Sequence, residues 1–88
     1  MPQRTVQIAN RNGLHARPAA EIVKLAAKFQ SDITIVKDDL DVNGKSIMGV
    51  MMLAAEHGSS ITFRAEGPDA EQALDALATL VGNKFGES

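Results

Sequence analysis

The chain has 88 residues, of which 44% are hydrophobic, and a formal net charge of −2 at pH 7. This length and apolar content predict one small globular domain over residues 1–88, and the near absence of aromatic residues predicts a mostly aliphatic core. The slightly acidic balance, with no basic stripe and no aromatic platform for stacking bases, argues against nucleic acid as a partner. Without cysteine there is no disulfide and no thiolate metal site, which suits a reducing compartment.

The chain carries no sign of export or membrane insertion. Residues 1–5 lack the apolar stretch of a signal peptide, and no segment approaches the roughly 18 apolar residues of a membrane span. We therefore expect a cytoplasmic protein.

The first half of the chain predicts a strand, a helix and two further strands. Thr5–Ala9 alternates polar and apolar residues, as a half-buried strand does. Apolar residues then recur at helical spacing from residue 16 to about 28 or 29. The β-branched run Ile33–Lys37 is typical of a strand, and Asp38-Asp39 turns the chain into a short strand around 40–42, so a hairpin is expected.

The second half predicts a short helix, a strand and a last helix. Ser46 is placed to cap a helix that runs to about residue 53 or 54, and Ile61–Ala65 has the pattern of a fourth strand. Asp69 and Gln72 have capping-box spacing, in which each side chain bonds the backbone N–H of the other. The last helix is expected to end at Gly82, and its apolar face comprises Ala70, Ala73, Leu74, Leu77, Leu80 and Val81.

These elements give the order βαββαβα and an α+β fold class. Helices after the first and the last strand favour a sheet that is covered on one face by helices. The pattern does not determine the order of the strands in the sheet. From the residues alone, a ferredoxin-like α+β domain is the natural expectation.

The stretch Gly13–Pro18 combines a turn glycine, a histidine, an arginine and a proline at the start of the first helix. Pro18 fits only in a first turn, because the amides there have no intrahelical acceptor to lose. His15 is therefore expected at or next to the N-cap, with Arg17 in the first turn. The amides and the dipole at this end favour an anion, so Ala16 and Arg17 are candidate phosphate-binding residues.

A histidine in this position suits phosphoryl transfer. The helix end disfavours an imidazolium cation, and a neutral imidazole has a lone pair that can attack phosphorus. The helix amides and the Arg17 guanidinium would then hold the charge of the phosphorylated ring. A lone histidine at a helix start is more often a capping or surface residue, so the hypothesis depends on the rest of the sequence.

A second stretch, Asn43–Met51, supports the hypothesis. With Gly13–Pro18 at this separation, it closely resembles HPr, the histidine-containing phosphocarrier family of the bacterial phosphoenolpyruvate-dependent phosphotransferase system. The resemblance covers essentially the whole chain. It implies an open-faced β-sandwich, a four-stranded antiparallel sheet with three helices on one face. It also implies that His15 is the catalytic residue that carries the phosphoryl group and that Arg17 assists it, with no cofactor and no metal.

The resemblance also implies partners. A carrier of this family accepts its phosphoryl group from enzyme I and passes it to an enzyme IIA, so it is a transient phosphohistidine carrier rather than a stand-alone enzyme. We expect a monomer. One alternative is the nitrogen-branch paralogue, which uses a different enzyme I, and Lys45–Gly49 favours ordinary HPr over it. Another is a non-catalytic regulatory binding module, against which the histidine at position 15 counts.

The short helix after Ser46 has more apolar residues than a small domain can bury. Ile47, Val50, Met51 and Ala54 share one face and are expected to point inward, which leaves the other methionines more exposed. Methionines often fill gaps in a core, but flexible methionines on a surface suit docking of several partners. In HPr this helix helps to dock enzyme I and the enzyme IIA proteins, and the candidate docking residues here are Ile47, Met48, Met51 and Met52.

Ser46 has two roles to consider. On physical grounds it is a helix N-cap. It also resembles the regulatory serine of HPr, which HPr kinase/phosphorylase modifies in many bacteria. A phosphate there adds about −2 charge to an apolar docking surface, so it is expected to weaken recognition of an acidic partner while the fold is kept. Such a partner would give a role to the nearby cations Arg17, Lys24, Lys28 and Lys45.

The remaining polar residues give weaker signals. His57 lies in a glycine-serine loop and is expected to be a solvated turn residue. Two histidines without matching carboxylate spacing do not support a zinc site. A serine hydrolase would need a nucleophile motif and an enclosed pocket, and the acidic pair Asp38-Asp39 is expected to stay solvated.

Overall fold

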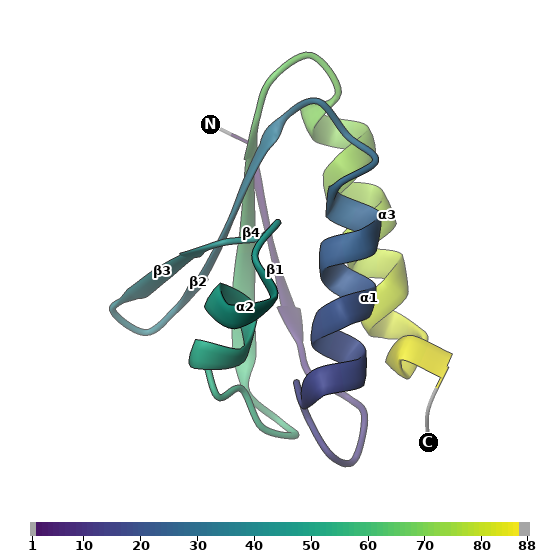
Figure 1. Cartoon of the computed structure of the whole chain (residues 1–88). Coiled ribbons are helices and arrows are strands. Elements are labelled where there is room, and N and C mark those ends of the chain that lie inside the picture. Colours follow the sequence, from purple (N-terminus) through teal and green to yellow (C-terminus); the bar gives the residue numbers. More distant parts are fainter. Residues whose placement is uncertain (1, 87–88) are drawn as a thin grey trace.

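The computed structural model describes residues 2–86 (Figure 1). Its elements are β1 (Gln3–Gln7), α1 (Ala16–Ala26), β2 (Asp32–Lys37), β3 (Leu40–Asn43), α2 (Ile47–Met52), β4 (Ser60–Glu66), α3 (Ala70–Gly82) and a short 3-10 helix, η1 (Lys84–Gly86). The predicted order βαββαβα is confirmed, and η1 is an addition that the sequence pattern did not predict. No helix within residues 2–86 is long and apolar enough to cross a membrane.

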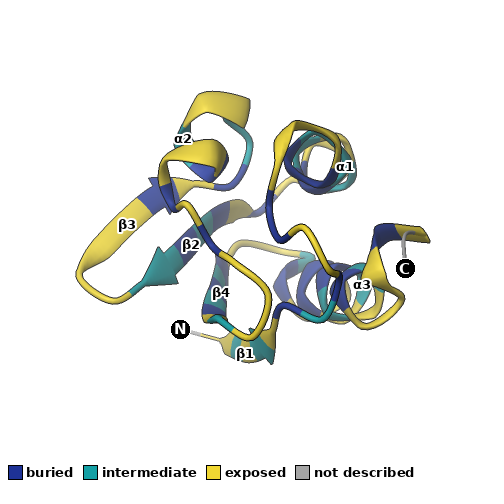
Figure 2. Ribbon diagram, turned by 90° about the horizontal axis from the view of Figure 1, so that it is seen from below, coloured by how far each residue is buried: buried dark blue, intermediate teal, exposed yellow. Residues whose placement is uncertain are grey.

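The strands of residues 2–86 form one antiparallel sheet in the order β1-β4-β2-β3. Thr5 of β1 lies opposite Thr62 of β4, and their hydroxyl oxygens are 2.9 Å apart. Ile35 of β2 lies opposite both Phe63 of β4 and Val42 of β3. Seen from below, α1, α2 and α3 lie on the same face of this sheet (Figure 2). The open-faced β-sandwich implied by the resemblance is therefore confirmed.

The core lies between this face of the sheet and the helices. Alternate residues of β2 and β4 point into it, which explains why both strands have the period-2 pattern. The core is mostly aliphatic, as the composition predicts, and its fully buried large side chains include Ile8, Ile22, Ile35, Ile61, Phe63, Leu74 and Leu77. Phe85 of η1 is also buried and closes the core beside α3.

The bounds of several elements differ from the prediction, most of all those of β1 and α1, and α2 ends at Met52 rather than at 53 or 54. β1 spans 3–7 rather than 5–9, and Ile8 turns its buried side chain inward while its backbone still pairs with Ser59 (N–O 2.8 Å). α1 ends at Ala26 rather than at 28 or 29. The chain there tightens into i to i−3 hydrogen bonds, such as Phe29 N to Ala26 O at 3.1 Å, and the Lys45 ammonium donates to the Phe29 carbonyl at 2.9 Å.

The predicted capping box at the start of α3 is wrong. Asp69 is the N-cap residue, but its side chain makes no capping hydrogen bond. Its carboxylate instead accepts bonds from the Ser31 hydroxyl at 2.6 Å and from the backbone amides of Ser31 and Gln30, both at 2.9 Å. The hydrogen bond from the Ser31 hydroxyl, followed by that from the Gln30 amide, lowers the pKa of Asp69 below its ordinary value. Asp69 thus ties the α1–β2 turn to the β4–α3 turn.

Candidate functional site

His15 is the N-cap of α1, as the sequence predicts. Its backbone is extended (φ −77°, ψ −173°), and its carbonyl accepts a 3.0 Å hydrogen bond from the Ala19 amide. The imidazole does not cap the helix by a side-chain hydrogen bond, and the residue is exposed to solvent. His15 is thus exposed at the N-terminus of an 11-residue helix, which is the positive end of the helix dipole.

The first turn of α1 combines features that favour an anion. Ala16 and Arg17 are exposed, Pro18 is buried, and no acidic residue lies in the first turn of this helix. The first-turn amides of any α-helix lack an intrahelical acceptor, and proline has no amide hydrogen to add to them. The structure therefore brings together His15, Ala16 and Arg17 on one exposed turn, where amide dipoles and a guanidinium act in the same direction.

The loop before His15 is locked to the chain that leaves α2. The Leu14 amide donates to the Ala55 carbonyl at 2.8 Å, and the Asn10 side-chain amide donates to the Gly13 carbonyl at 2.8 Å. Gly13 has φ +66°, and a Cβ there would lie 2.5 Å from the Ala55 oxygen, so only glycine fits. Sequence reasoning missed this lock. The turn composition of 10–13 pointed to a loop but could not reveal its contact with Ala55.

Ser46 caps α2, as predicted. Its hydroxyl accepts a hydrogen bond from the Gly49 amide at 3.1 Å. The predicted inward face of α2 is partly wrong. Val50 is fully buried, but Ile47 and Met51 are each 44% exposed, and Ala54 is exposed. Leu53, at the end of the helix, is buried in their place, because α2 has only six residues and makes less than two turns above the sheet.

The outer side of α2 is therefore an exposed apolar patch, which we call the α2 patch. It comprises Ile47 (44% exposed), Met48 (77%), Met51 (44%) and Met52 (66%). α2 packs beside α1 on the same side of the sheet, as Figure 2 shows, and the chain leaving it bonds to the His15 loop. A partner that covers this patch would therefore also approach His15.

The other cations expected near a partner differ in their surroundings. Lys24 lies 3.8 Å from Glu21, and Lys28 is exposed. Lys45 is engaged at the end of α1, because its ammonium donates to the Phe29 carbonyl at 2.9 Å. We therefore assign Lys45 a structural role, in which it holds the end of α1, ahead of a role in contacting a partner.

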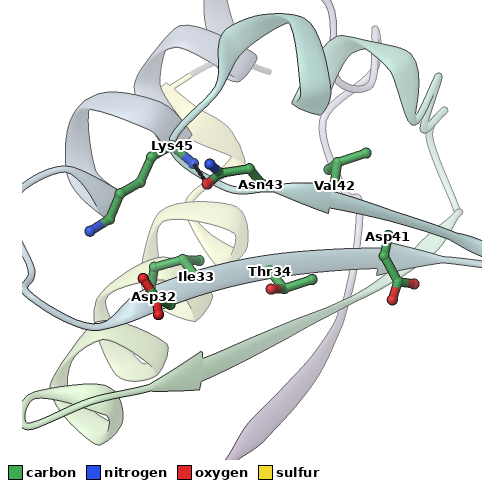
Figure 3. A pocket seen from close by; sticks show the side chains of 7 residues that line it. All are labelled: Asp32, Ile33, Thr34, Asp41, Val42, Asn43 and Lys45. Atoms are coloured by element: carbon green, nitrogen blue, oxygen red, sulfur yellow. Dashed lines mark hydrogen bonds between the residues drawn. The ribbon is translucent and has the colours of Figure 1, made fainter.

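An open hollow lies along the β2–β3 edge of the sheet (Figure 3). Its volume is about 540 Å³, and it is lined by Asp32, Ile33, Thr34, Asp41, Val42, Asn43 and Lys45. The Lys45 ammonium extends away from Asn43 toward the end of α1, while its backbone amide is held by the Asn43 side chain at 2.9 Å. Two carboxylates in the lining make this hollow unsuited to a phosphate group.

No group of three or more histidine, cysteine, aspartate or glutamate side chains within residues 2–86 is arranged to hold a metal ion. His57 is exposed in the loop between α2 and β4. The groups that lie together at the start of α1 are the imidazole of His15, the helix amides and the Arg17 guanidinium.

Comparison with known proteins identifies the family. A family model described as "PTS HPr component phosphorylation site" matches residues 2–83. The chain is 52% identical over 87 residues to a phosphocarrier protein HPr of Treponema pallidum, covering 99% of each chain. It also matches the crystal structure of HPr-C-His from Thermoanaerobacter tengcongensis with a TM-score of 0.96 and 49% identity, covering 100% of this chain and 99% of that one.

The open-faced β-sandwich of this chain is thus shared with a class of small phosphocarriers. The chain belongs to the HPr family of the phosphotransferase system.

Two further matches bear on the alternatives. A phosphocarrier protein NPr of Shewanella violacea is 42% identical over 86 residues, covering 98% of this chain and 94% of that protein. An HPr dimer from Thermoanaerobacter tengcongensis matches with a TM-score of 0.80 and 49% identity, covering 99% of this chain and all of that one. A relative of this fold has therefore been solved as a dimer, and the expected monomer stays a prediction for this chain.

Proposed function

We propose that His15 accepts a phosphoryl group from a phosphorylated enzyme I and passes it to a histidine of an enzyme IIA. The observation that carries the proposal is the exposed imidazole at the N-cap of α1, on an extended backbone and beside Ala16 and Arg17. In the first transfer, a ring nitrogen of His15 forms a bond to phosphorus as the bond to the donor imidazole breaks. The second transfer is the same reaction with the roles exchanged.

The first turn of α1 is the source of electrostatic stabilisation in this proposal. Negative charge spreads over the three equatorial oxygens during phosphoryl transfer, and amides or guanidinium groups that are already in place stabilise it. The Ala16 amide and the Arg17 side chain are assigned to that charge. Arg17 also suits the phosphorylated state, because a guanidinium can donate two parallel hydrogen bonds to a phosphate.

The α2 patch is the proposed docking surface for both partners. Its four exposed apolar side chains lie on the side of the molecule that carries His15, and flexible methionines adapt to partners of different shape. The exposed cations Arg17 and Lys24 on α1, and Lys28 just beyond its end, would face acidic groups of a partner. The proposed setting is the cytoplasm, with enzyme I, enzyme IIA proteins and HPr kinase/phosphorylase as partners.

Regulation at Ser46 forms the second part of the proposal. Phosphorylation there would place about −2 charge next to Ile47 and Met48 at the edge of the α2 patch. The charge would weaken docking of an acidic partner without unfolding the domain, since a phosphate at a helix start also meets backbone amides.

Ser46→Asp and Ser46→Ala separate the two roles of this serine. Aspartate is itself a good N-cap, so Ser46→Asp keeps the cap and adds the charge, whereas Ser46→Ala removes the cap without adding charge. We expect slower phosphorylation by enzyme I for Ser46→Asp alone. An equal rate for Ser46→Asp and the unmodified protein would contradict the regulatory proposal.

The central experiment is intact mass after incubation with enzyme I and phosphoenolpyruvate. We expect one added phosphate that is lost in acid and is absent from His15→Ala. Arg17→Gln should slow the transfer by at least about tenfold, which corresponds to one charge-assisted contact, while Lys28→Gln should change it much less. An added phosphate that persists in His15→Ala would overturn the assignment of the carrier residue.

A nitrogen-branch carrier is the second candidate, and the NPr relative at 42% identity favours testing it. Repeating the mass measurement with an enzyme I of each branch, at matched concentrations, decides between the two. Acceptance from the nitrogen-branch enzyme alone would support the second candidate. Acceptance from neither would point to a regulatory binding module instead of a carrier.

A further inference from the structure

A second basic site lies beside the loop that leads to His15. A hollow of about 280 Å³ is lined by Ala9, Arg11, His57 and Lys84. These residues come from the β1–α1 loop, the α2–β4 loop and η1, three segments that meet at the lower end of the molecule in Figure 1. Arg11 and Lys84 supply cationic N–H donors, and either form of an imidazole has an N–H to donate.

The polar side chains that line this hollow are all basic. Among residues 2–86, no carboxylate lines it. Within the same range, the ion pairs engage other cations, namely Arg4 with Asp75, Lys24 with Glu21, Lys37 with Asp38 and Arg64 with Asp41. In a chain of formal net charge −2, two cations and an imidazole around one hollow form a local field that favours an anion.

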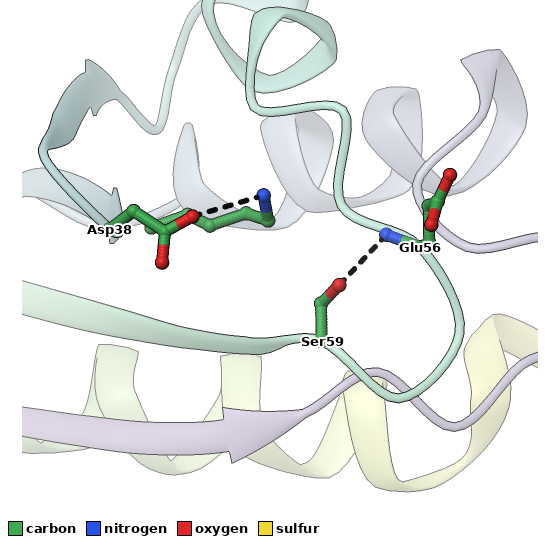
Figure 4. A network of polar contacts seen from close by, with 4 residues as sticks. Asp38, Glu56 and Ser59 are labelled. Carbon is green, nitrogen blue, oxygen red and sulfur yellow. Dashed lines mark hydrogen bonds and ion pairs between the residues drawn. The ribbon is translucent and has the colours of Figure 1, made fainter.

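The loop that carries His57 is held by backbone hydrogen bonds to Ile8, the residue before Ala9. The Gly58 amide donates to the Ile8 carbonyl and the Ile8 amide donates to the Ser59 carbonyl, both at 2.8 Å. The turn itself is closed by the Ser59 hydroxyl, which accepts from the Glu56 amide at 3.1 Å. Figure 4 shows this bond and shows the Glu56 carboxylate pointing away from Ser59. His57 is therefore presented on a turn that is fixed before any ligand binds.

Lys84 is held at the hollow by a strained backbone. Lys84 and Phe85 both have φ +56°, and two successive residues other than glycine in the left-handed region are costly. Burial of the Phe85 side chain, which is 4% exposed, offsets the cost and fixes η1 beside α3. Lys84 lines the hollow together with Arg11 and His57.

We propose that Arg11, His57 and Lys84 bind a small phosphorylated metabolite, at a site separate from His15. A phosphomonoester carries close to two negative charges at neutral pH, which matches the two fixed cations, and its oxygens can accept bonds from all three side chains. A hollow of about 280 Å³ has room for a phosphate group and a few carbon atoms. The inference goes beyond the proposed carrier function and does not depend on it.

The two histidines of the chain allow each site to report separately. We would titrate the protein with inorganic phosphate and with glycerol 3-phosphate at one neutral pH and constant ionic strength, following the ring Cε1–H signals of His57 and His15 by NMR. The expected result is a saturating shift of the His57 signal that persists in His15→Ala. A shift confined to His15, or a drift of His57 that does not saturate with either probe, would overturn the proposal.

Variants that remove cations inside and outside the hollow test whether the hollow binds the anion. Arg11→Gln with Lys84→Gln should weaken the binding seen at His57 by at least about fivefold, since each removed cation loses a short-range contact with the dianion. Lys28→Gln, which removes an exposed cation outside the hollow, should leave it unchanged. Equal weakening by Lys28→Gln would mean that general surface charge attracts the anion and would refute a defined site. Amide spectra of each variant establish that it is folded.

Discussion

α2 and α3 are both rich in apolar residues, yet they bury them very differently. α3 turns Ala70, Ala73, Leu74, Leu77 and Val81 into the core. Within α2, Val50 is the buried residue, and the four residues of the α2 patch remain 44–77% exposed. Contiguous apolar patches on a protein surface mark interaction sites more often than scattered apolar residues do, so the α2 patch is an indication of binding.

The difference follows from length and position. α3 has 13 residues and lies along β1, β4 and α1, so one whole stripe of the helix is covered. α2 has six residues and packs against β3, an edge strand, and against α1. A helix of less than two turns above a sheet edge can bury little more than one side chain. The stability of the domain should therefore depend on α3, and recognition on α2.

Leu74→Ala should have the largest effect on stability. Leu74 is 1% exposed in α3, and removal of a fully buried leucine side chain costs about 2–5 kcal/mol. Urea unfolding followed by circular dichroism measures the change. Leu80→Ala in the same helix, where the side chain is only half-buried, should cost clearly less. Similar losses for the two variants would contradict the assignment of the stabilising face of α3.

Asp69→Asn tests how α3 is attached. The carboxylate accepts three hydrogen bonds from Gln30 and Ser31, and an amide cannot replace a charged acceptor for all of them. We expect the melting temperature at neutral pH to fall by several degrees. Glu71→Gln, at an exposed position in the first turn of α3, serves as the control and should change it little.

The pKa of Asp69 gives this prediction a pH dependence. Because folding lowers that pKa below its ordinary value of 3.8, the carboxylate stabilises the fold fully above that value. The stabilisation is lost as the pH falls below 3.8 toward the lowered pKa of the folded state. The difference in melting temperature between the native protein and Asp69→Asn should therefore shrink in acid. A difference independent of pH would show that the ionised carboxylate is not its source.

Ala54→Gly should stabilise the chain that leaves α2. Ala54 has φ +49°, a left-handed conformation that costs an L-residue about 1–2 kcal/mol and costs glycine almost nothing. Glycine has more conformational entropy in the unfolded chain, which offsets part of this stabilisation. The free energy of unfolding, measured with urea, should therefore rise by about 0.5–1 kcal/mol. Ala55→Gly is the matched control, because Ala55 is buried and has no positive φ, and it should destabilise the protein.

The sequence predicted those features of the fold that depend on local pattern. The order of the helices and strands follows from hydrophobic periodicity, and the N-caps His15 and Ser46 follow from residues that neighbour them. The misses have distant causes. Asp69 accepts hydrogen bonds from Ser31, 38 residues away, instead of forming the predicted capping box. α1 ends three residues before Phe29, whose carbonyl accepts a hydrogen bond from the Lys45 ammonium.

The same division holds for the two basic sites. His15, Ala16 and Arg17 are consecutive, so their common exposure at one helix end was readable from the chain. The Gly13–Ala55 lock and the meeting of Arg11 with His57 and Lys84 join segments that are far apart in sequence. No local pattern marks such sites, because each residue alone has the composition of an ordinary loop. The inward face of α2 was misjudged because the predicted helix ran to residue 53 or 54, whereas α2 ends at Met52 and Leu53 is buried just beyond it.

Met48→Ala should have the smallest effect on stability and a large effect on recognition. Met48 is 77% exposed, so truncation should change the free energy of unfolding by no more than about 0.5 kcal/mol. If the α2 patch docks partners, loss of this side chain should raise KM for the carrier with enzyme I by up to about tenfold and leave kcat nearly unchanged. Steady-state transfer assays measure both constants.

Leu40→Ala gives this last prediction its control. Leu40 is an exposed apolar residue of β3, 38% exposed, that lies outside the α2 patch. A raised KM for Met48→Ala but not for Leu40→Ala would tie recognition to α2, because the two variants remove similar apolar side chains from the surface. Unchanged KM in both would mean that the exposed methionines of α2 do not contact enzyme I. The contrast between the two apolar helices would then concern stability alone.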